Sequence, residues 1–489
     1  MLRLPPACLL FLLASTLGSP AAPPPAMVRF ATYNVSFFRT TAGALDAELV
    51  AASPTAAANP SNIHRVAEAL QRIQPDVLLL NEFDYDGGTA LNRFADKVLA
   101  VPQKPGLLAL DYPYRYSAPS NTGVSSGFDL DNANGIVTTP GTESYGNDCF
   151  GYGLFPGQYA PAILSKFPIE TSKVRTFQLF KWKDMPGSRL LLPTGSPPLT
   201  TYYTAVEREV LRLSSKTHLD VPINLGNGII AHLLASHPTP PTFDAAEDKN
   251  GKRNFDEIRL WADYVDPDRA GYLYDDNGQF GGLPTGARFV VAGDQNADPN
   301  DGDTVSGAAR QLTTHPLVNA GFIPSSARYG NGGASFPGGS GQIGNKANDT
   351  AAFSGGLRVD YVLPSRAGFS VFDGAVFWPG PADPLRSVVN DRDPSDHHLV
   401  WLDLRPRISL AEAVVDFTAE WNGTAVGLSW QASAGYAYLV QQSPSMAAAT
   451  WVDAGVPVII APVTGRATAS VPANVAGRMF YRVQISFAP

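Results

Sequence analysis

The first part of the chain alternates between short apolar runs and a helical pattern. Residues 28–33 and 77–80 are apolar runs suited to buried strands. Between them, apolar side chains recur every three or four positions from Ile63 to Ile73, which predicts an amphipathic helix. Ser61 is the expected N-cap, and Pro75 marks the end of the helix. This strand–helix–strand order predicts an α/β fold with helices packed outside a sheet.

Similar apolar runs continue as far as residue 404. Further strands are predicted at residues 162–165, 210–214, 228–235, 289–292, 359–363 and 398–404. Residues 255–265 predict a second long helix, because their apolar positions share one face. The stretches 112–160, 180–200 and 298–356 are rich in polar and turn-forming residues and predict long ordered loops. We therefore expect one large α/β domain over residues 27–406.

The pattern changes after residue 406. Short apolar segments at 425–430, 437–441, 451–452 and 480–483 are separated by Gly, Pro, Ala and Ser. Such spacing predicts short strands joined by turns. The segment contains no cluster of catalytic residue types. Residues 407–489 therefore predict a small all-β sandwich that serves as an accessory domain.

Composition and charge narrow the class of protein. Hydrophobic residues make up 44% of the chain and charged residues 16%, which predicts a large core and excludes disorder. The formal net charge is -8, so the chain lacks the basic footprint of a tight nucleic-acid binder. A negative net charge is still compatible with an enzyme that binds phosphate through a metal ion, because the ion supplies local positive charge.

The N-terminus has the pattern of a secretory signal. Arg3 precedes the apolar run 9–13, and small residues then lead into the Pro-rich stretch 20–25. The run is too short for a bilayer span, which takes about 20 residues, although a short anchor is an alternative. We predict a signal peptide and linker over residues 1–26, a secreted protein (extracellular or periplasmic) and no stable membrane span. Cys149 would then lack a disulfide partner and is expected to be a small buried residue.

Polar residues of catalytic types stand at or near the ends of the apolar runs. In chain order they are Asn34, Glu82, His237, Asp294, Asn296, Asp360, Asp396 and His397. Taken singly, each could be a turn residue, a helix cap or a member of a surface ion pair. Together at one sheet edge, such side chains can bind a hard cation and activate water.

This ordered set resembles the endonuclease/exonuclease/phosphatase superfamily, which has the deoxyribonuclease I-like fold. The resemblance covers roughly residues 28–404 and rests on Thr-Tyr-Asn (32–34), Leu-Asn-Glu (80–82), Ser-His-Pro (236–238), Gly-Asp-Gln-Asn (293–296), Val-Asp-Tyr (359–361) and Ser-Asp-His (395–397). It implies a four-layer α/β sandwich that hydrolyses phosphoesters with a divalent metal. With residues 407–489 as a fibronectin III-like module, the chain resembles a secreted bacterial-type member of that superfamily.

The resemblance also implies which residues hold the metal. Asn34 and Glu82 match residues that position or bind it, and Asp396 is expected beside them. Mg²⁺, or Mn²⁺ in its place, suits such a set because Mg²⁺ takes one or two carboxylates and keeps several waters. We therefore expect Mg²⁺ or Mn²⁺ at Asn34, Glu82 and Asp396.

The remaining five residues match the catalytic positions of the superfamily. His237 would donate to a phosphate oxygen as charge grows in the transition state. Asp294 and Asn296 would orient water and a phosphate oxygen, and Asp360 would fix the tautomer of His397. The sequence does not choose between Asp294 and His397 as the base.

Two further groups of residues have competing interpretations. Lys249, Lys252 and Arg253 could bind a second substrate phosphate, but a solvated loop is slightly favoured. The acidic stretches 84–87, 129–132 and 298–303 resemble partial Ca²⁺ loops. None has full EF-hand spacing, and turn chemistry is the favoured explanation over structural Ca²⁺.

Three functions are compatible with the sequence. The first is a monomeric phosphoesterase acting on small or lipid phosphodiesters or phosphomonoesters, and the second is a nonspecific extracellular nuclease acting on DNA or RNA. The third is a non-catalytic surface-binding protein that keeps the same fold. The intact set of candidate ligands argues against the third, and the acidic charge mildly favours the first over the nuclease.

Overall fold

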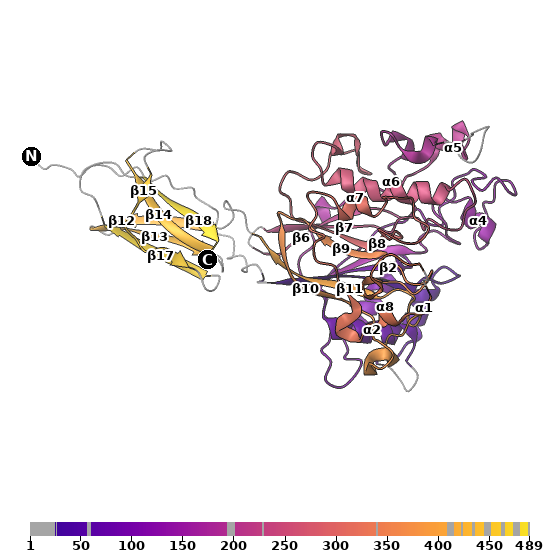
Figure 1. Cartoon of the computed structure of the whole chain (residues 1–489), viewed down its shortest axis with the longest axis horizontal. Coiled ribbons are helices and arrows are strands. Elements are labelled where there is room, and N and C mark those ends of the chain that lie inside the picture. The colour runs from indigo at the N-terminus through magenta and orange to yellow at the C-terminus, as the bar shows by residue number, and fades with distance from the viewer. Residues whose placement is uncertain are drawn as a thin grey trace, which may run out of the picture. The chain divides into compact units, whose positions relative to one another are not determined.

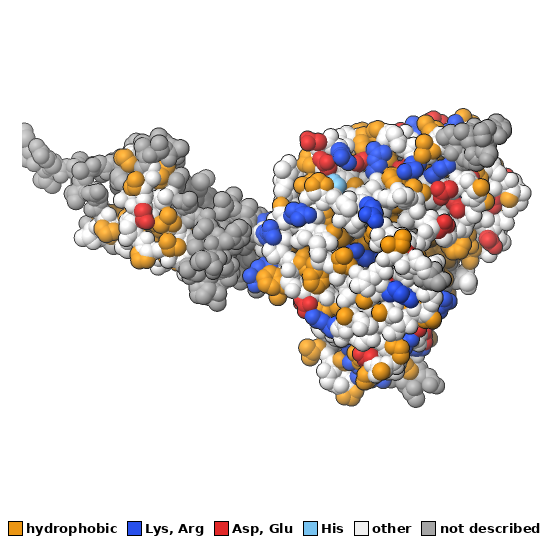
Figure 2. Space-filling model, viewed as in Figure 1, with side chains coloured by type: hydrophobic (Ala, Val, Ile, Leu, Met, Phe, Trp, Pro, Cys, Tyr) orange, Lys and Arg blue, Asp and Glu red, His pale blue; other side chains and the backbone are white. Residues whose placement is uncertain are grey.

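A computed structural model of the chain places two compact units, one made of residues 27–225 and 230–406 and the other containing the strands after residue 407 (Figure 1). The structure describes residues 25, 27–55, 60–192, 201–226, 229–338, 341–407, 415–421, 424–432, 436–444, 451–460, 465–472 and 480–487. The predicted signal segment, residues 1–26, lies almost entirely outside the described residues. On the face drawn in Figure 2, basic and acidic side chains of the larger unit are interspersed.

The first sheet of the larger unit has six strands in the order β10-β11-β1-β2-β4-β3. Their bounds are β1 (Val28–Phe37), β2 (Val77–Phe83), β3 (Tyr114–Ser117), β4 (Ala160–Ser165), β10 (Phe369–Phe377) and β11 (Leu399–Pro406). Strands β1 and β2 are parallel, and the other neighbours are antiparallel. The second sheet has the order β5-β6-β7-β8-β9. Its strands are β5 (Arg175–Thr176), β6 (Leu219–Asn224), β7 (Ile230–Ala235), β8 (Phe289–Asp294) and β9 (Asp360–Pro364).

The two sheets face each other, with helices on their outer sides. Strand β1 contacts both β8 and β9, so the sheets are packed through their inner faces. Helices α1 (Ala44–Ala51) and α2 (Asn62–Ile73) cover the first sheet, and α6 (Lys249–Tyr264) and α7 (Arg310–Thr313) cover the second (Figure 1). This confirms the predicted four-layer α/β sandwich.

The remaining helices of the described chain are short. They are α3 (Thr89–Arg93), η1 (Phe94–Leu99), α4 (Glu143–Asn147), η2 (Thr171–Lys173), η3 (Trp182–Asp184), η4 (Arg189–Leu191), α5 (Ala205–Val210), η5 (Ala270–Tyr272), η6 (Ser326–Tyr329), α8 (Gly332–Ser335), η7 (Lys346–Asn348) and η8 (Pro384–Ser387). Of these, α4, η3, η4, η6, α8 and η7 lie in the predicted long loops, and the other short helices lie in connections outside them.

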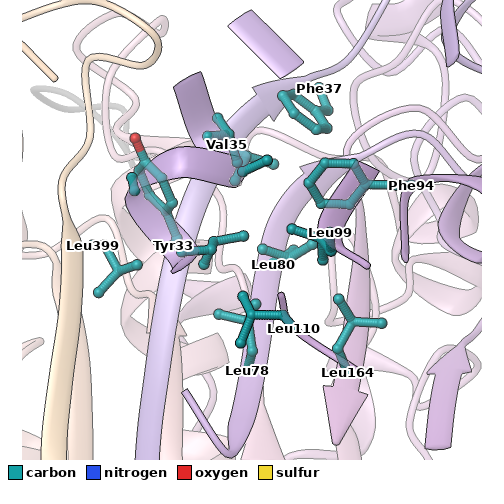
Figure 3. Close-up of a cluster of buried hydrophobic side chains, with 14 of the residues drawn as sticks. Tyr33, Val35, Phe37, Leu78, Leu80, Phe94, Leu99, Leu110, Leu164 and Leu399 are labelled. Carbon is teal, nitrogen blue, oxygen red and sulfur yellow. The ribbon is translucent and has the colours of Figure 1, made fainter. Parts of the chain in front are cut away.

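Each outer face of the sandwich has its own hydrophobic core. Figure 3 shows the core under α2, where Leu78 and Leu80 of β2 meet Leu99 and Leu110. The second core packs Trp261 and Tyr264 of α6 against the second sheet. Burying each such side chain stabilises the fold by about 1.5–3 kcal/mol. Two well-packed cores thus fix the strands whose ends carry the candidate residues.

The smaller unit consists of two antiparallel sheets. One contains β12 (Val415–Trp421), β13 (Ala425–Ala432) and β17 (Gly465–Pro472), and the other contains β14 (Tyr436–Ser443), β15 (Val452–Asp453), β16 (Ile459–Ile460) and β18 (Phe480–Phe487). Trp430 and Tyr438, one from each sheet, lie in its buried core. This unit is the predicted all-β sandwich.

The structure contains elements that the apolar pattern did not predict, among them α1, β3, β6 and β10, and local details differ at two further places. Residues 210–214 do not form a strand. Val210 is the last residue of α5, which begins at a reciprocal capping box between Thr204 and Glu207, and Arg212 makes only an isolated bridge to Lys181. Ser61 precedes α2, but its hydroxyl pairs with Nδ1 of His64 at 2.8 Å and does not cap the helix. No helix among the described residues is long and apolar enough to span a bilayer.

Candidate active site

The candidate residues meet where the two sheets face each other. Asn34 and Glu82 lie near the ends of β1 and β2 in the first sheet, and Asp294 and Asp360 lie on β8 and β9 in the second. The amide Nδ2 of Asn34 donates to Oδ2 of Asp294 at 3.2 Å, so a hydrogen bond joins the two sheets directly. Segments far apart in the chain thus supply one polar cluster.

Asp294 is the hub of this cluster. Its Oδ2 lies 3.2 Å from Nδ2 of Asn34, 3.4 Å from Nε2 of His237 and 3.5 Å from Nε2 of His397. Its Oδ1 accepts the backbone N–H of Asn296 at 2.9 Å. Burial raises the pKa of this carboxyl, because the charged form loses hydration. A carboxylate with a raised pKa and several nearby donors is suited to exchange a proton.

His397 is held by a second carboxylate. Its Nδ1 lies 2.9 Å from Oδ2 of Asp360, and Thr350 Oγ1 donates to the same oxygen at 2.8 Å. Burial disfavours the imidazolium, but the charges of Asp360 and Asp294 outweigh that effect and hold the pKa of His397 well above its ordinary value. The two neighbouring carboxylates therefore favour the imidazolium form of His397.

His237 has the opposite electrostatic character. Burial lowers its pKa well below the ordinary value, and the positive charges of Lys216 and His397 lower it further. The imidazole is therefore neutral, with Nε2 facing Asp294 and a buried Nδ1 that has no hydrogen-bond partner among the described residues. Two histidines in one cluster thus occupy different protonation states.

Glu82 and Asn34 stand at irregular points of their strands. The pairing of β1 and β2 shifts register beyond Asn34, and Glu82 has a positive φ of 58°. A bulge re-aims side chains, and a non-glycine residue with positive φ costs about 1–3 kcal/mol, which is typical of functional positions. Burial raises the pKa of Glu82, while His397 and a hydrogen bond from Asn34 oppose that rise. The Asn34 amide thus touches the carboxylates of both Glu82 and Asp294.

The donor set around Glu82 fits a hard divalent cation. The carboxylate of Glu82 accepts a hydrogen bond from Asn34 and interacts electrostatically with Asp396, and Mg²⁺ prefers such oxygen ligands. Glu82 is half-buried, and the loss of hydration raises its pKa, so a bound cation would favour its charged form. A second group, Asp294, Asp360 and His397, has ligand atoms within 4.8 Å of one another. In that group Nδ1 of His397 is already paired with Oδ2 of Asp360 at 2.9 Å.

A family model described as "Endonuclease/Exonuclease/phosphatase family" matches residues 31–397, more than half of the chain. The chain belongs to this family. No match was found among curated protein sequences. Similar solved structures include an endonuclease/exonuclease/phosphatase from Beutenbergia cavernae (16% identity, 95% of this chain and 94% of that chain, TM-score 0.41) and TDP2 from Caenorhabditis elegans (14%, 78% and 74%, TM-score 0.36). Another is a beta toxin mutant from Staphylococcus aureus with bound magnesium ions (13%, 78% and 100%, TM-score 0.34).

Two motif residues of the family serve as supports. Asn296 has a φ of 51°, and its Nδ2 donates to the carbonyl of Pro238 at 3.1 Å, so it braces the loop that carries His237. Ser395 Oγ donates to the carbonyl of Asn34 at 2.8 Å and accepts the N–H of His397 at 3.1 Å. The Ser-Asp-His motif is thereby tied to the end of β1.

The three basic residues considered for a second substrate phosphate lie on helix α6. Lys249, Lys252 and Arg253 form part of α6 and not a solvated loop, because the helix begins at Lys249. Arg253 is buried, and its guanidinium donates to backbone carbonyls, including that of Leu213 at 2.9 Å. Lys249 donates to the hydroxyl of Tyr202 at 2.8 Å. The donors of Arg253 are therefore committed to backbone carbonyls of the fold.

Sequence reasoning missed Lys216 and Thr350. Lys216 is buried, and its Nζ donates to the carbonyl of Pro238 at 3.4 Å. Burial lowers its pKa, while the carboxylates of Glu257, Glu82 and Asp294 oppose that effect. Neither residue belongs to an apolar run with a polar end, which was the signal that located the others. Lys216 thus places a buried amine beside the loop that carries His237.

The acidic loops mainly accept backbone hydrogen bonds. Asp84 Oδ2 accepts the N–H of Arg39 at 2.7 Å, and Asp298 Oδ1 accepts the N–H of Asn300 at 2.7 Å. Asp129 and Asp131 lie with Asp148 in a group whose oxygens could hold a cation. The Asp298 bond is the expected turn chemistry, whereas the Asp84 bond joins segments far apart in the chain.

Cys149 is buried, as the sequence predicted. Its thiol lies 3.1 Å from the carbonyl of Tyr145, and burial raises its pKa to about 12. A thiol in this state is a poor nucleophile at neutral pH.

Proposed function

We propose that this family member is a divalent-metal-dependent phosphoesterase that hydrolyses its substrate by direct attack of water on phosphorus. The observation that carries the proposal is the convergence of Asn34, His237 and His397 on Oδ2 of Asp294, within 3.5 Å. One carboxylate surrounded by an amide, a neutral imidazole and an imidazolium can both activate water and border a charged phosphoryl group.

Each residue receives a separate task in this mechanism. Asp294, whose pKa is raised by burial, accepts a proton from the attacking water. His397, kept cationic by Asp360, and Lys216 stabilise the negative charge that grows on the phosphoryl oxygens. His237 is neutral and donates one N–H to a non-bridging oxygen.

Glu82, Asp396 and Asn34 would hold Mg²⁺ or Mn²⁺. The bound ion would supply charge neutralisation of the phosphate and of the leaving oxygen. Loss of hydration raises the pKa of Glu82, so metal binding would favour its charged form and release the proton from any fraction of this carboxyl that is protonated. A metal titration in weakly buffered solution tests this through the protons released, with Glu82→Gln as the variant that should lack the release.

Small or lipid phosphoesters are the proposed substrate class. The positive charges coupled to the cluster are Lys216 and His397, both buried, which fits a single phosphoryl group. A protein that tracks a nucleic-acid strand instead uses a basic groove with stacking aromatics. The alternative, a nonspecific nuclease on DNA or RNA, remains the second candidate because the family includes both activities by its description. A screen of DNA, RNA, phosphomonoesters and phosphodiesters with Mg²⁺, Mn²⁺ and EDTA decides between them.

Secretion and the accessory domain complete the proposal. Residues 1–26 would direct export and be removed, which N-terminal sequencing of the exported protein tests. The unit after residue 407 would bind a surface or stabilise the catalytic unit. Deleting residues 408–489 separates these roles, since a surface-binding role predicts lost retention with unchanged activity on soluble substrate.

A further inference from the structure

Helix α6 presents a buried carboxylate to the back of the catalytic cluster. Glu257 is fully buried, and both of its oxygens are used. Its Oε1 accepts the backbone N–H of Ser215 at 2.6 Å and the Ser215 hydroxyl at 2.9 Å, and its Oε2 accepts the N–H of Thr239 at 2.6 Å. One side chain therefore joins two loops that are more than twenty residues apart in the chain.

Each of these loops carries a group that faces the phosphate site. Ser215 is followed directly by Lys216, and Thr239 lies two residues after His237. The loops also touch each other, because Lys216 Nζ donates to the carbonyl of Pro238 at 3.4 Å. Moving either loop would displace a positive charge or a hydrogen-bond donor from the reacting phosphoryl group.

Asn254, three residues before Glu257 on α6, holds the same segments. Nδ2 of Asn254 donates to the carbonyl of Thr239 and to the carbonyl of Gln295, each at 2.9 Å. Gln295 is next to Asp294, the hub of the cluster. The inner face of α6 thus contacts all three segments that carry Lys216, His237 and Asp294.

We propose that Glu257 is a positioning residue for phosphoester hydrolysis, because it fixes Lys216 and His237 relative to Asp294 through Ser215 and Thr239. This inference rests on the proposed function and goes beyond it, since Glu257 itself touches no reacting atom. A carboxylate is suited to this task because it accepts several short N–H and O–H bonds at once, whereas an amide of the same shape can accept on one side only.

Activity and stability can be separated by a matched pair of variants. Glu257→Gln removes one acceptor and the charge while keeping the shape. Asp256→Asn makes the same chemical change one residue earlier on α6, where the carboxylate accepts bonds from Trp182 and Arg189. We expect Glu257→Gln to lower kcat roughly 10–100-fold and to raise KM as well, because the loops that carry Lys216 and His237 also hold the phosphoryl group, and small misplacement of catalytic groups costs up to about 10²-fold. Asp256→Asn should stay within about twofold of the wild type in kcat.

A double-mutant cycle with Lys216→Met tests whether Glu257 acts through the loops. Residues that act as a unit are strongly non-additive. In the Lys216→Met background, Glu257→Gln should therefore cost about threefold or less in kcat. An unchanged kcat in Glu257→Gln, or an equal loss in both backgrounds, would overturn the proposal. If Glu257→Gln does not fold, Ser215→Ala takes its place, because it removes one donor to Glu257; a wild-type kcat in that variant would equally overturn it.

Binding of inorganic phosphate separates this inference from the proposed function. If the wild type hydrolyses no phosphoester in the screen, the proposed function fails on its own. The Kd for inorganic phosphate, measured by ³¹P NMR, should still rise about tenfold or more in Glu257→Gln, which corresponds to about 1.4 kcal/mol of binding free energy. The same Kd should be unchanged in Asp256→Asn. Equal binding by the two variants would refute the positioning role.

Discussion

His397 and Asp360 form a buried pair in which Nδ1 and Oδ2 are 2.9 Å apart. Because the carboxylate accepts the Nδ1 proton, the opposite nitrogen, Nε2, points at Oδ2 of Asp294, 3.5 Å away. The pair therefore sets both the orientation and the charge of the imidazole that faces the proposed phosphate site.

Replacing Asp360 by Asn should remove that charge while keeping the size of the side chain. Without the carboxylate, burial dominates and the pKa of His397 should fall, so the imidazole loses its positive charge at neutral pH. We expect kcat to fall about 10²–10⁴-fold. Asp373→Asn, at an exposed ion pair with Arg328, is the control and should retain activity. Steady-state kinetics measure both, and an active Asp360→Asn variant would contradict the assigned role.

Thr350 supports Asp360 from behind. Its hydroxyl donates to Oδ2 of Asp360 and accepts the N–H of Val359 at 3.0 Å. Thr350→Ala leaves buried groups unpaired and should lower the free energy of unfolding by about 1–3 kcal/mol. We expect kcat to drop roughly tenfold, on the scale of 1.4 kcal/mol per tenfold. Thr350→Ser keeps the hydroxyl and should retain most of the wild-type free energy of unfolding and kcat. If Thr350→Ser loses as much as Thr350→Ala, the methyl group and not the hydroxyl is responsible.

Gly293 allows β8 to approach the loop that carries His237. Its φ is 132°, and a Cβ at this position would lie 2.0 Å from the carbonyl oxygen of Ser236. Gly293→Ala should therefore displace Asp294 or His237 and lower the free energy of unfolding by about 2 kcal/mol or more. Chemical denaturation and kcat should both show the loss. Gly278→Ala, at a positive φ with no neighbour within 4 Å, serves as the control for backbone strain alone.

Asp256 gives a prediction on pH and stability. Burial raises its pKa from 3.8 to about 6, so the native state binds this proton more tightly than the unfolded state. The contribution to stability is fully present below pH 3.8 and is lost as pH rises through about 6. Asp256→Asn should remove this dependence, which amounts to about 2–3 kcal/mol. Urea denaturation at pH 4.5 and pH 7.5 tests it, and parallel pH profiles for wild type and variant would contradict it.

The sequence located the strand ends but not the residues that support them. Asn34, Asp294 and Asp360 were predictable because each stands at or near the edge of an apolar run. Thr350 lies in a long polar loop, and its role depends on a contact with β9 that local pattern cannot reveal. Glu257 is likewise one of several acids on α6, and its burial depends on the packing of that helix.

Arg253 is a residue that the sequence suggested was exposed and that the structure buries. Its neighbourhood of Lys249 and Lys252 has the composition of a solvated basic segment or a phosphate site. The helix instead turns Arg253 inward, where its guanidinium donates to the carbonyls of Leu213 and Arg212. Charge along the sequence does not specify which face of a helix is buried, so composition alone could not separate these outcomes.

Metal-dependent hydrolysis is the most direct test of the central claim. The wild type should hydrolyse a generic phosphodiester or phosphomonoester in Mg²⁺ or Mn²⁺ and lose that activity in EDTA. Asp396→Ala and His397→Ala should abolish turnover, with circular dichroism spectra unchanged from the wild type. Full activity in EDTA, or in either folded variant, would contradict the account.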